Sequence, residues 1–282
     1  MSNEKTLDTL VPDIYNLFDP ENDHICSEEN LTSFAEGLKD IIRARLRKYE
    51  RPTSPLRFSA LGKQDLQVWF EAHPDPENPP EDLLPKTYLK FLYGDIIEAM
   101  LLLLVKEAGH TVTDEQAEVS VDGVKGHIDA IIDGVVVDVK SASPYGYKKF
   151  EDNSVERDDP FGYVAQLSGY SNVLTPGQEA AWLAMDKVGG DICVSTLSPR
   201  VIKHYPPENR IEHLKSVIAS STPPERCYPD TPDGSSGNRK LNTACSYCAH
   251  KFRCWENLRV FLYSNGPRYL TVCKREPNVP EA

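Results

Sequence analysis

The chain has 282 residues, enough for one large domain or for a core with appended segments. Its 40% hydrophobic and 26% charged residues are typical of a globular protein, and its longest apolar run, from Ala99 to Val105, is too short to cross a bilayer. The net charge of −12 excludes a protein that coats DNA through bulk positive charge, but not an enzyme with a locally basic groove. The first residues do not resemble a signal peptide, so we expect a soluble protein of the cytoplasm, or of the host cytoplasm if the chain is viral.

Residues 1–57 are predicted to form an accessory helical region. A short helix is expected from Asp8 to Phe18, and a longer helix, capped by Ser27 or Asn30, carries a stripe of apolar side chains. The stripe consists of Leu31, Phe34, Leu38, Ile41, Ile42 and Leu46. The end of this helix is basic, with Arg43, Arg45, Arg47, Lys48 and Arg51. These cations either complement the helix dipole or contact phosphates, and the sequence favours neither interpretation.

Residues 58–220 are predicted to form an α/β core in which a central mixed sheet is flanked by helices. Ser59 is expected to cap a helix that buries Leu61, Leu66, Trp69 and Phe70, and a Pro-rich acidic loop follows at 73–85. The remaining expected elements are a helix at 86–107, an edge strand at 112–121, a hairpin at 124–140, a loop at 141–150, a helix opened by Pro160, strands at 179–186 and 192–197, and a helix at 207–219. The loop at 141–150 is either a lid over the site or an ordinary surface loop.

The hairpin turns at Asp133-Gly134, a strong signal for a two-residue turn. That turn sets a register in which Ala130 faces Val137, Asp129 faces Asp138 and His127 faces Lys140. Asp129, Asp138 and Lys140 then emerge on one face of the sheet. Two carboxylates directly opposite each other repel, so the pair predicts either a divalent cation beside Lys140 or a solvated outer face. His127 is expected to fill space rather than to bind metal.

A further carboxylate, Glu98, falls in the apolar half of the helix predicted at 86–107, where an unpaired charge is costly. Glu98, Asp129, Asp138 and the backbone carbonyl of Val139 together offer oxygen ligands to a hard divalent cation. Lys140 would place a fixed positive charge beside the attacking water or the scissile phosphate. Phosphodiester hydrolysis needs this combination, because the water must be activated and the charge of the transition state neutralised.

Four short motifs in this order resemble the PD-(D/E)xK nuclease superfamily, and within it the RecB-like exonucleases that include phage recombination exonucleases. The motifs are Gly94-Asp-Ile-Ile-Glu98, Gly126-His-Ile-Asp129, Asp138-Val-Lys140 and Gln166-Leu-Ser-Gly-Tyr170. The resemblance covers about residues 56 to 200. Each motif alone is weak, whereas the four in order are specific.

The resemblance implies a restriction-endonuclease-like core and assigns a role to each matched residue. Asp129 and Asp138 would bind Mg²⁺ or Mn²⁺ with help from Glu98, Lys140 would be catalytic, and Gln166 and Tyr170 would support the site and the DNA. The implied activity is a DNA exonuclease of phage or bacterial recombination, repair or genome degradation. A single-strand annealing or single-strand-binding protein is the implied partner, and a homo-oligomer is compatible with the family.

Residues 221–282 are predicted to form a cysteine module that binds a metal cluster. The spacing Cys245-x2-Cys248-x5-Cys254 is similar to the iron–sulfur segment of certain RecB-like nucleases. In those relatives the first ligand lies in a motif resembling residues 59–70, which here contain no cysteine, so Cys227 is the expected fourth ligand and Cys26 the alternative. Four thiolates suit a [4Fe–4S] cluster, which we favour, or Zn²⁺, for which His250 could replace one thiolate.

Two other functions compete with the exonuclease. The first is an endonuclease of the same superfamily that acts on flaps, junctions or specific sites, and cleavage of a closed circle would identify it. The second is a non-catalytic DNA-binding module, which would bind DNA without turnover. Tyr145 and Tyr147, in the loop after Lys140, are candidates for stacking on bases.

Overall fold

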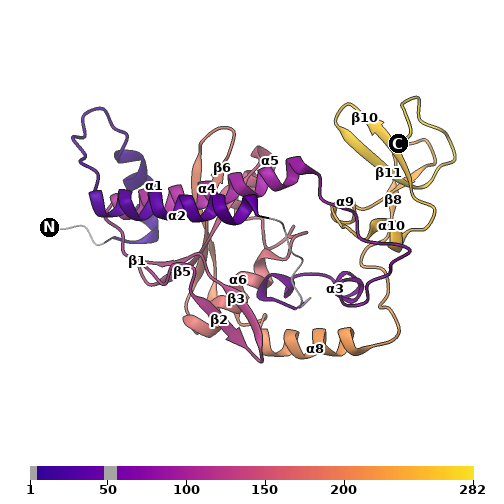
Figure 1. Cartoon of the computed structure of the whole chain (residues 1–282), viewed down its shortest axis with the longest axis horizontal. Coiled ribbons are helices and arrows are strands. Elements are labelled where there is room, and N and C mark those ends of the chain that lie inside the picture. Colours follow the sequence, from indigo (N-terminus) through magenta and orange to yellow (C-terminus); the bar gives the residue numbers. More distant parts are fainter. Residues whose placement is uncertain (1–4, 48–55) are drawn as a thin grey trace. The chain divides into compact units, whose positions relative to one another are not determined.

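The computed structural model describes residues 5–47 and 56–282. The chain divides into two compact units, of which the first comprises Met1–Gly62 and Leu84–Ile211 and the second Lys63–Leu83 and Glu212–Ala282 (Figure 1). Lys48 and Arg51, two of the predicted basic residues, lie outside the described residues. No helix in the described ranges is both long and apolar enough to span a bilayer.

The first unit is built on a five-stranded sheet with the strand order β1-β4-β5-β6-β7. Its strands are β1 (Val112–Thr113), β4 (Ala130–Ile132), β5 (Val135–Ala142), β6 (Ala180–Asp186) and β7 (Ile192–Leu197). Strands β5 and β6 are parallel, and the other neighbours are antiparallel. The predicted class, an α/β fold with a central mixed sheet, is therefore confirmed, and the topology is consistent with a restriction-endonuclease-like core.

Helices cover both faces of this sheet. Val137 and Val139 of β5 share a buried cluster with Leu10 of α1 (Leu7–Asn16) and Leu101 of α4 (Pro85–Glu107). The opposite face meets α5 (Pro144–Glu151) and α6 (Tyr163–Leu174), and the ring of Phe150 lies 6.0 Å from that of Trp182. Alternation along the strand therefore places Asp138 and Lys140 on the face that α6 covers.

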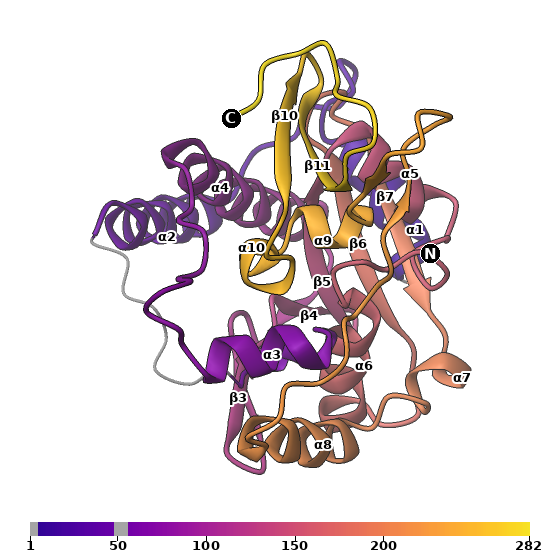
Figure 2. The same cartoon turned by 90° about the vertical axis from the view of Figure 1, so that its right-hand side faces the viewer.

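Helix α2 (Glu28–Leu46) lies along α4 in both views of the molecule (Figures 1 and 2). Ser27 caps this helix and accepts a hydrogen bond from the backbone of Asn30 at 3.3 Å. Of the two predicted caps, Ser27 and Asn30, the first is therefore confirmed. None of the side chains of α2 is fully buried, so its apolar stripe is only partly covered. The predictions for α1 and α4 are confirmed as well, and Gly109 with a φ of +81° follows the end of α4.

Backbone conformation overturns the predicted edge strand at 112–121. Asp114 and Gln116 both have φ of +54°, which breaks the strand into β1 and β2 (Glu118–Val121). Strand β2 then pairs with β3 (Val124–His127) in a separate two-stranded ribbon. The segment predicted as one edge strand thus forms two strands, which belong to two different sheets.

Three further differences from the prediction concern helix starts, and side-chain hydrogen bonds to the backbone explain two of them. The predicted loop at 141–150 consists of the end of β5 and most of the helix α5, because Ser143 caps that helix and accepts a hydrogen bond from the backbone of Gly146 at 3.2 Å. The next helix begins at Tyr163 rather than at Pro160, because the Asp159 carboxylate accepts hydrogen bonds from the backbone of residues 161–164. Ser59 caps no α-helix: it lies in the short 3-10 helix η1 (Phe58–Ala60).

The second unit combines α3 (Asp65–Ala72), the end of α8 (Pro207–Ala219) and the chain from there to its C-terminus. Its antiparallel sheet has the order β10-β11-β9-β8, with β8 at Thr231–Pro232, β9 at Arg239–Lys240, β10 at Arg259–Tyr263 and β11 at Gly266–Val272. The short helices α9 (Thr243–Ser246) and α10 (Lys251–Cys254) carry two of the predicted cysteine ligands. The core of this unit, formed by Leu66, Trp69, Phe70 and Val217, packs against Cys227 and Cys254.

Candidate active site

The predicted hairpin turn and most of its register are correct. Asp133 and Gly134 have φ of +50° and +83°, and Ala130 pairs with Val137. The ladder ends at Ala130, however, so Asp129 is not paired across the strands with Asp138 as predicted. His127 lies opposite Glu118 in the β2–β3 ribbon, which overturns its predicted position opposite Lys140. The cause is the interruption of the strand at Ile128 and Asp129.

Asp129 joins β5 through its side chain instead. Its Oδ2 accepts a hydrogen bond from the backbone N–H of Val139 at 2.6 Å, in the place where a strand residue would continue the ladder. The N–H and C=O groups of one strand residue point to the same edge of the strand. The carbonyl of Val139 therefore faces the side on which Asp129 lies, as a metal ligand at this position requires.

Asp138 and Lys140 form an ion pair in the interior of the first unit. The Lys140 ammonium lies 2.5 Å from Oδ2 of Asp138 and 5.0 Å from the ring centre of Tyr163. Burial alone would lower the pKa of Lys140, but the negative charges of Asp138 and Asp129 outweigh burial and raise this pKa above its usual value. Lys140 is therefore a cation at neutral pH. Apart from this ion pair, Oδ2 of Asp138 is a buried oxygen that accepts no hydrogen bond.

Glu98 reaches the same region from α4. Burial, followed by the charges of Asp129, Asp138 and Asp95, raises the pKa of Glu98 to about 8. Burial and the charge of Asp138 likewise raise the pKa of Asp129 to about 7. Burial and the neighbouring negative charges thus make ionisation of Glu98 and Asp129 less favourable, and a bound cation would relieve this cost. The oxygen ligands and their excess negative charge fit a hard divalent ion such as Mg²⁺ or Mn²⁺.

Gln166 and Tyr170 lie on α6, one turn apart, as their motif predicts. A hydrogen bond from the Gln166 side chain stabilises the Tyr170 phenolate slightly, but burial dominates and raises the pKa of Tyr170 to about 12. The Tyr170 ring stacks on Phe58 at 4.9 Å. A Cβ atom on Gly126 would lie 2.5 Å from Cβ of Phe58 and 2.6 Å from the Tyr170 hydroxyl, which explains the glycine of the Gly-x-x-Asp motif. Phe58 was missed from the sequence, because no pattern linked it to this glycine.

The predicted DNA-contacting groups have other neighbours. Arg43 pairs with Asp40 at 3.1 Å, and Arg45 donates two hydrogen bonds, of 2.5 and 2.7 Å, to Asp95. Tyr147 is buried under the sheet, so it is wrong as a stacking candidate. The Tyr145 side chain is 77% exposed and remains available to a base.

The four predicted cluster ligands, Cys227, Cys245, Cys248 and Cys254, all belong to the second unit. Burial, and then the neighbouring thiols of the other three, raise the pKa of Cys245 to about 12. Backbone N–H groups of Leu66 and Gln67, at the start of α3, donate hydrogen bonds to the Cys227 sulfur. His250, the alternative zinc ligand, is buried with its ring 5.4 Å from that of Phe70.

Cys26, the alternative fourth ligand, lies in the first unit beside His24 and Glu107. Within the described ranges these three residues form the only trio of His, Cys, Asp or Glu whose ligand atoms all lie within 4.8 Å of one another. Glu107 accepts hydrogen bonds from His24 at 2.9 Å, from the backbone of Ser27 at 3.0 Å and from Asn30 at 2.7 Å. Those bonds satisfy its carboxylate without a metal and join the start of α2 to the end of α4.

Comparison with known proteins adds two distant structural similarities. No protein-family profile matches the sequence, and no curated protein matches it. The crystal structure of SSO0001 is similar with 17% identity and a TM-score of 0.39, over 79% of this chain and 94% of that chain. An alkaline exonuclease (LHK-Exo) from Laribacter hongkongensis is similar with 12% identity and a TM-score of 0.35, over 64% of this chain and 89% of that chain. Similarity at this level does not identify an activity.

Proposed function

We propose that the protein is a divalent-metal-dependent deoxyribonuclease of the PD-(D/E)xK type that hydrolyses phosphodiester bonds. One observation carries the proposal. Glu98 from α4, Asp129 from the break before β4, and Asp138 from β5 interact electrostatically with one another and with Lys140. Burial and the neighbouring negative charges raise the pKa values of Glu98 and Asp129, an arrangement that is costly for structure alone and useful for holding a cation.

The proposed ligands of Mg²⁺ or Mn²⁺ are the carboxylates of Glu98, Asp129 and Asp138 and the carbonyl of Val139. When bound, the ion would lower the pKa of a water molecule and neutralise charge on the phosphate. The buried carboxylate of Asp138 supports this assignment, because its Oδ2 faces the Lys140 ammonium at 2.5 Å and a buried carboxylate needs positive charge beside it.

Lys140 supplies a permanent positive charge in this proposal. Since its pKa is raised, it keeps its proton at the pH at which nucleases act and cannot serve as the general base. An ammonium group held in a buried site stabilises the negative charge that develops on the phosphate oxygens, and it needs no reorganisation during the reaction. Gln166 and Tyr170 act indirectly: Tyr170 packs against Gly126 and Phe58 and so fixes the strand that leads to Asp129.

The exonuclease mode, with a role in phage or bacterial recombination, repair or genome degradation, follows from the motif resemblance alone. The same holds for a single-strand annealing or single-strand-binding partner and for a homo-oligomer. Incubation of the protein with linear and with covalently closed circular DNA, in Mg²⁺, Mn²⁺ or EDTA, tests the proposal. We expect degradation of linear DNA only, and only with metal. Cutting of the circle would identify an endonuclease, and binding without cleavage would contradict a nuclease.

For the cysteine module we propose a [4Fe–4S] cluster held by Cys227, Cys245, Cys248 and Cys254. Backbone N–H donors to the sulfur of Cys227 support this, since such bonds stabilise cluster thiolates. Anaerobic purification tests it: a brown protein is expected, and a colourless protein containing zinc would overturn it.

A further inference from the structure

The turn between β1 and β2 adopts a backbone conformation that its residues disfavour. Asp114 and Gln116 both have φ of +54°, a region that L-residues other than asparagine and aspartate rarely occupy, so that Gln116 is the disfavoured residue of the two. A glutamine side chain does not by itself stabilise this left-handed backbone conformation. Strained residues of this kind persist where the surrounding structure holds them, and they gather at functional sites.

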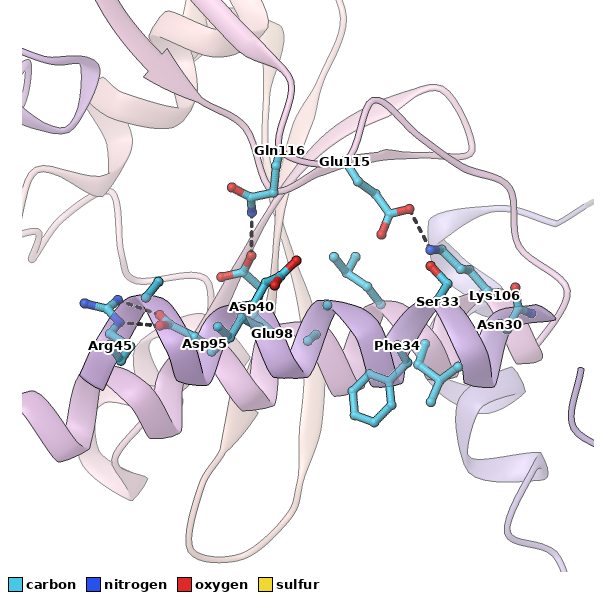
Figure 3. Close-up of a pocket in the computed structure, with 16 residues that line it drawn as sticks. Asn30, Ser33, Phe34, Asp40, Arg45, Asp95, Glu98, Lys106, Glu115 and Gln116 are labelled. Atoms are coloured by element: carbon cyan, nitrogen blue, oxygen red, sulfur yellow. Dashed lines mark hydrogen bonds and ion pairs between the residues drawn. The ribbon is translucent and has the colours of Figure 1, made fainter. Parts of the chain in front are cut away.

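Contacts of this turn show what holds it. The side-chain amide of Gln116 donates a hydrogen bond to Oε1 of Glu98 at 2.7 Å, and its backbone N–H donates to the carbonyl of Asp129 at 3.2 Å. One residue earlier, Glu115 pairs with Lys106 of α4 at 2.6 Å (Figure 3). Gln116 is thus bonded at once to two of the three carboxylate residues that we assign to the metal.

A cavity beside Glu98 makes this restraint necessary. Its volume is about 650 Å³, and α2, α4 and the turn at 115–116 line it. Figure 3 shows Glu98 pointing toward Gln116 across this space. Without the amide of Gln116, the Glu98 carboxylate would have room to rotate, and it already faces repulsion from Asp129, Asp138 and Asp95.

We propose that Gln116 is a positioning residue that fixes Oε1 of Glu98 and leaves Oε2 to the divalent cation. The proposal deepens the proposed function and rests on it, because it takes Glu98 to be a metal ligand. Residues that hold a ligand in this way commonly change metal affinity 10- to 100-fold when they are removed. The left-handed backbone at Gln116 is what carries its side chain to Glu98.

Two glycine variants separate the side chain from the backbone. Gln116→Gly relieves the left-handed conformation and removes the amide, whereas Asp114→Gly relieves the same conformation two residues earlier and leaves Gln116 intact. Mn²⁺ affinity is measured by isothermal titration calorimetry, and the melting temperature is measured without metal. We expect neither variant to melt below the wild type, and Gln116→Gly alone to bind Mn²⁺ about 10- to 100-fold more weakly.

Two results would overturn the proposal: wild-type Mn²⁺ affinity in Gln116→Gly, or an equal loss in Asp114→Gly, which would assign the effect to the turn. If Gln116→Gly does not fold, Gln116→Asn replaces it, because asparagine tolerates the left-handed backbone and its amide is one methylene too short to reach Glu98. The same loss is expected there, and wild-type affinity again overturns the proposal. Wild-type protein that binds no Mn²⁺ would instead contradict the proposed function.

Discussion

Oδ2 of Asp129 accepts a hydrogen bond of 2.6 Å from the backbone N–H of Val139, so a side chain occupies the position where a strand would continue the sheet. This relationship places a carboxylate and a backbone carbonyl at one edge of β5. It also explains why the strand stops at Ala130. The break in the ladder is therefore part of the candidate site.

Lys140 is expected to contribute to the rate of cleavage. Lys140→Ala removes the positive charge beside Asp138, and we expect kcat to fall by about 10²- to 10³-fold, as when one group that stabilises transition-state charge is lost. Single-turnover cleavage of end-labelled DNA measures this. Lys149→Ala is the matched control, because Lys149 also pairs with an aspartate, the exposed Asp158, at 2.5 Å. This variant should cleave DNA as the wild type does. A wild-type rate in Lys140→Ala would remove Lys140 from the mechanism.

Metal affinity should rise with pH. The pKa values of Glu98, raised to about 8, and of Asp129, raised to about 7, mean that protons compete with the cation below these values. Calorimetric titration with Mn²⁺ should therefore show an affinity that increases from about pH 6 to about pH 8, with protons released on binding. An affinity that does not change over this range would contradict the electrostatic account of the site.

Stability of the metal-free protein should change in the opposite direction. A carboxyl group whose pKa is higher in the folded than in the unfolded chain stabilises the fold at low pH, and this contribution is lost as pH rises through the folded pKa. The melting temperature in EDTA should thus fall as pH rises from about 4 to about 8. Glu98→Gln, which cannot ionise, should melt higher than the wild type at about pH 8. A lower melting temperature for Glu98→Gln there would refute this reasoning.

Gly126→Ala should destabilise the first unit. The added Cβ would lie 2.5 Å from Cβ of Phe58, so the strand or the ring must move, and overpacking of this kind costs about 1–3 kcal/mol. Gly37→Ala on α2 is the control: it has open space around it, and we expect a gain of about 0.5–1 kcal/mol from helix propensity. Urea denaturation measures both. Equal stability of the two variants would show that Gly126 is not tightly packed.

The cysteines can be separated by single substitutions. Cys227→Ser should abolish iron incorporation and the visible absorbance of the anaerobically purified protein, whereas Cys26→Ser should retain both. Iron analysis and the absorption spectrum give the answer. If Cys227→Ser retained a full cluster and Cys26→Ser lost it, Cys26 rather than Cys227 would be the fourth ligand.

Local signals predicted much of this architecture. The Asp-Gly turn, the apolar run of α4 and the two strands at 180–186 and 192–197 each agree with the structure because pattern and packing favour the same element. What failed depended on single side chains whose hydrogen-bond partners the hydrophobic pattern does not identify. Asp129 ends a strand by bonding to the backbone of Val139, Asp159 delays a helix by bonding to the backbone that follows it, and the Gln116 amide bonds to the carboxylate of Glu98.

The central claim is that the carboxylates beside Lys140 hydrolyse DNA through a divalent metal, and Asp138→Asn tests it most directly. This variant keeps the shape of the side chain and removes its charge. Cleavage of linear DNA in Mn²⁺ is compared with that of Asp158→Asn, which alters an exposed carboxylate that also pairs with a lysine at 2.5 Å. We predict no cleavage by Asp138→Asn and wild-type cleavage by Asp158→Asn, with both proteins folded. Wild-type cleavage by Asp138→Asn would contradict the assignment.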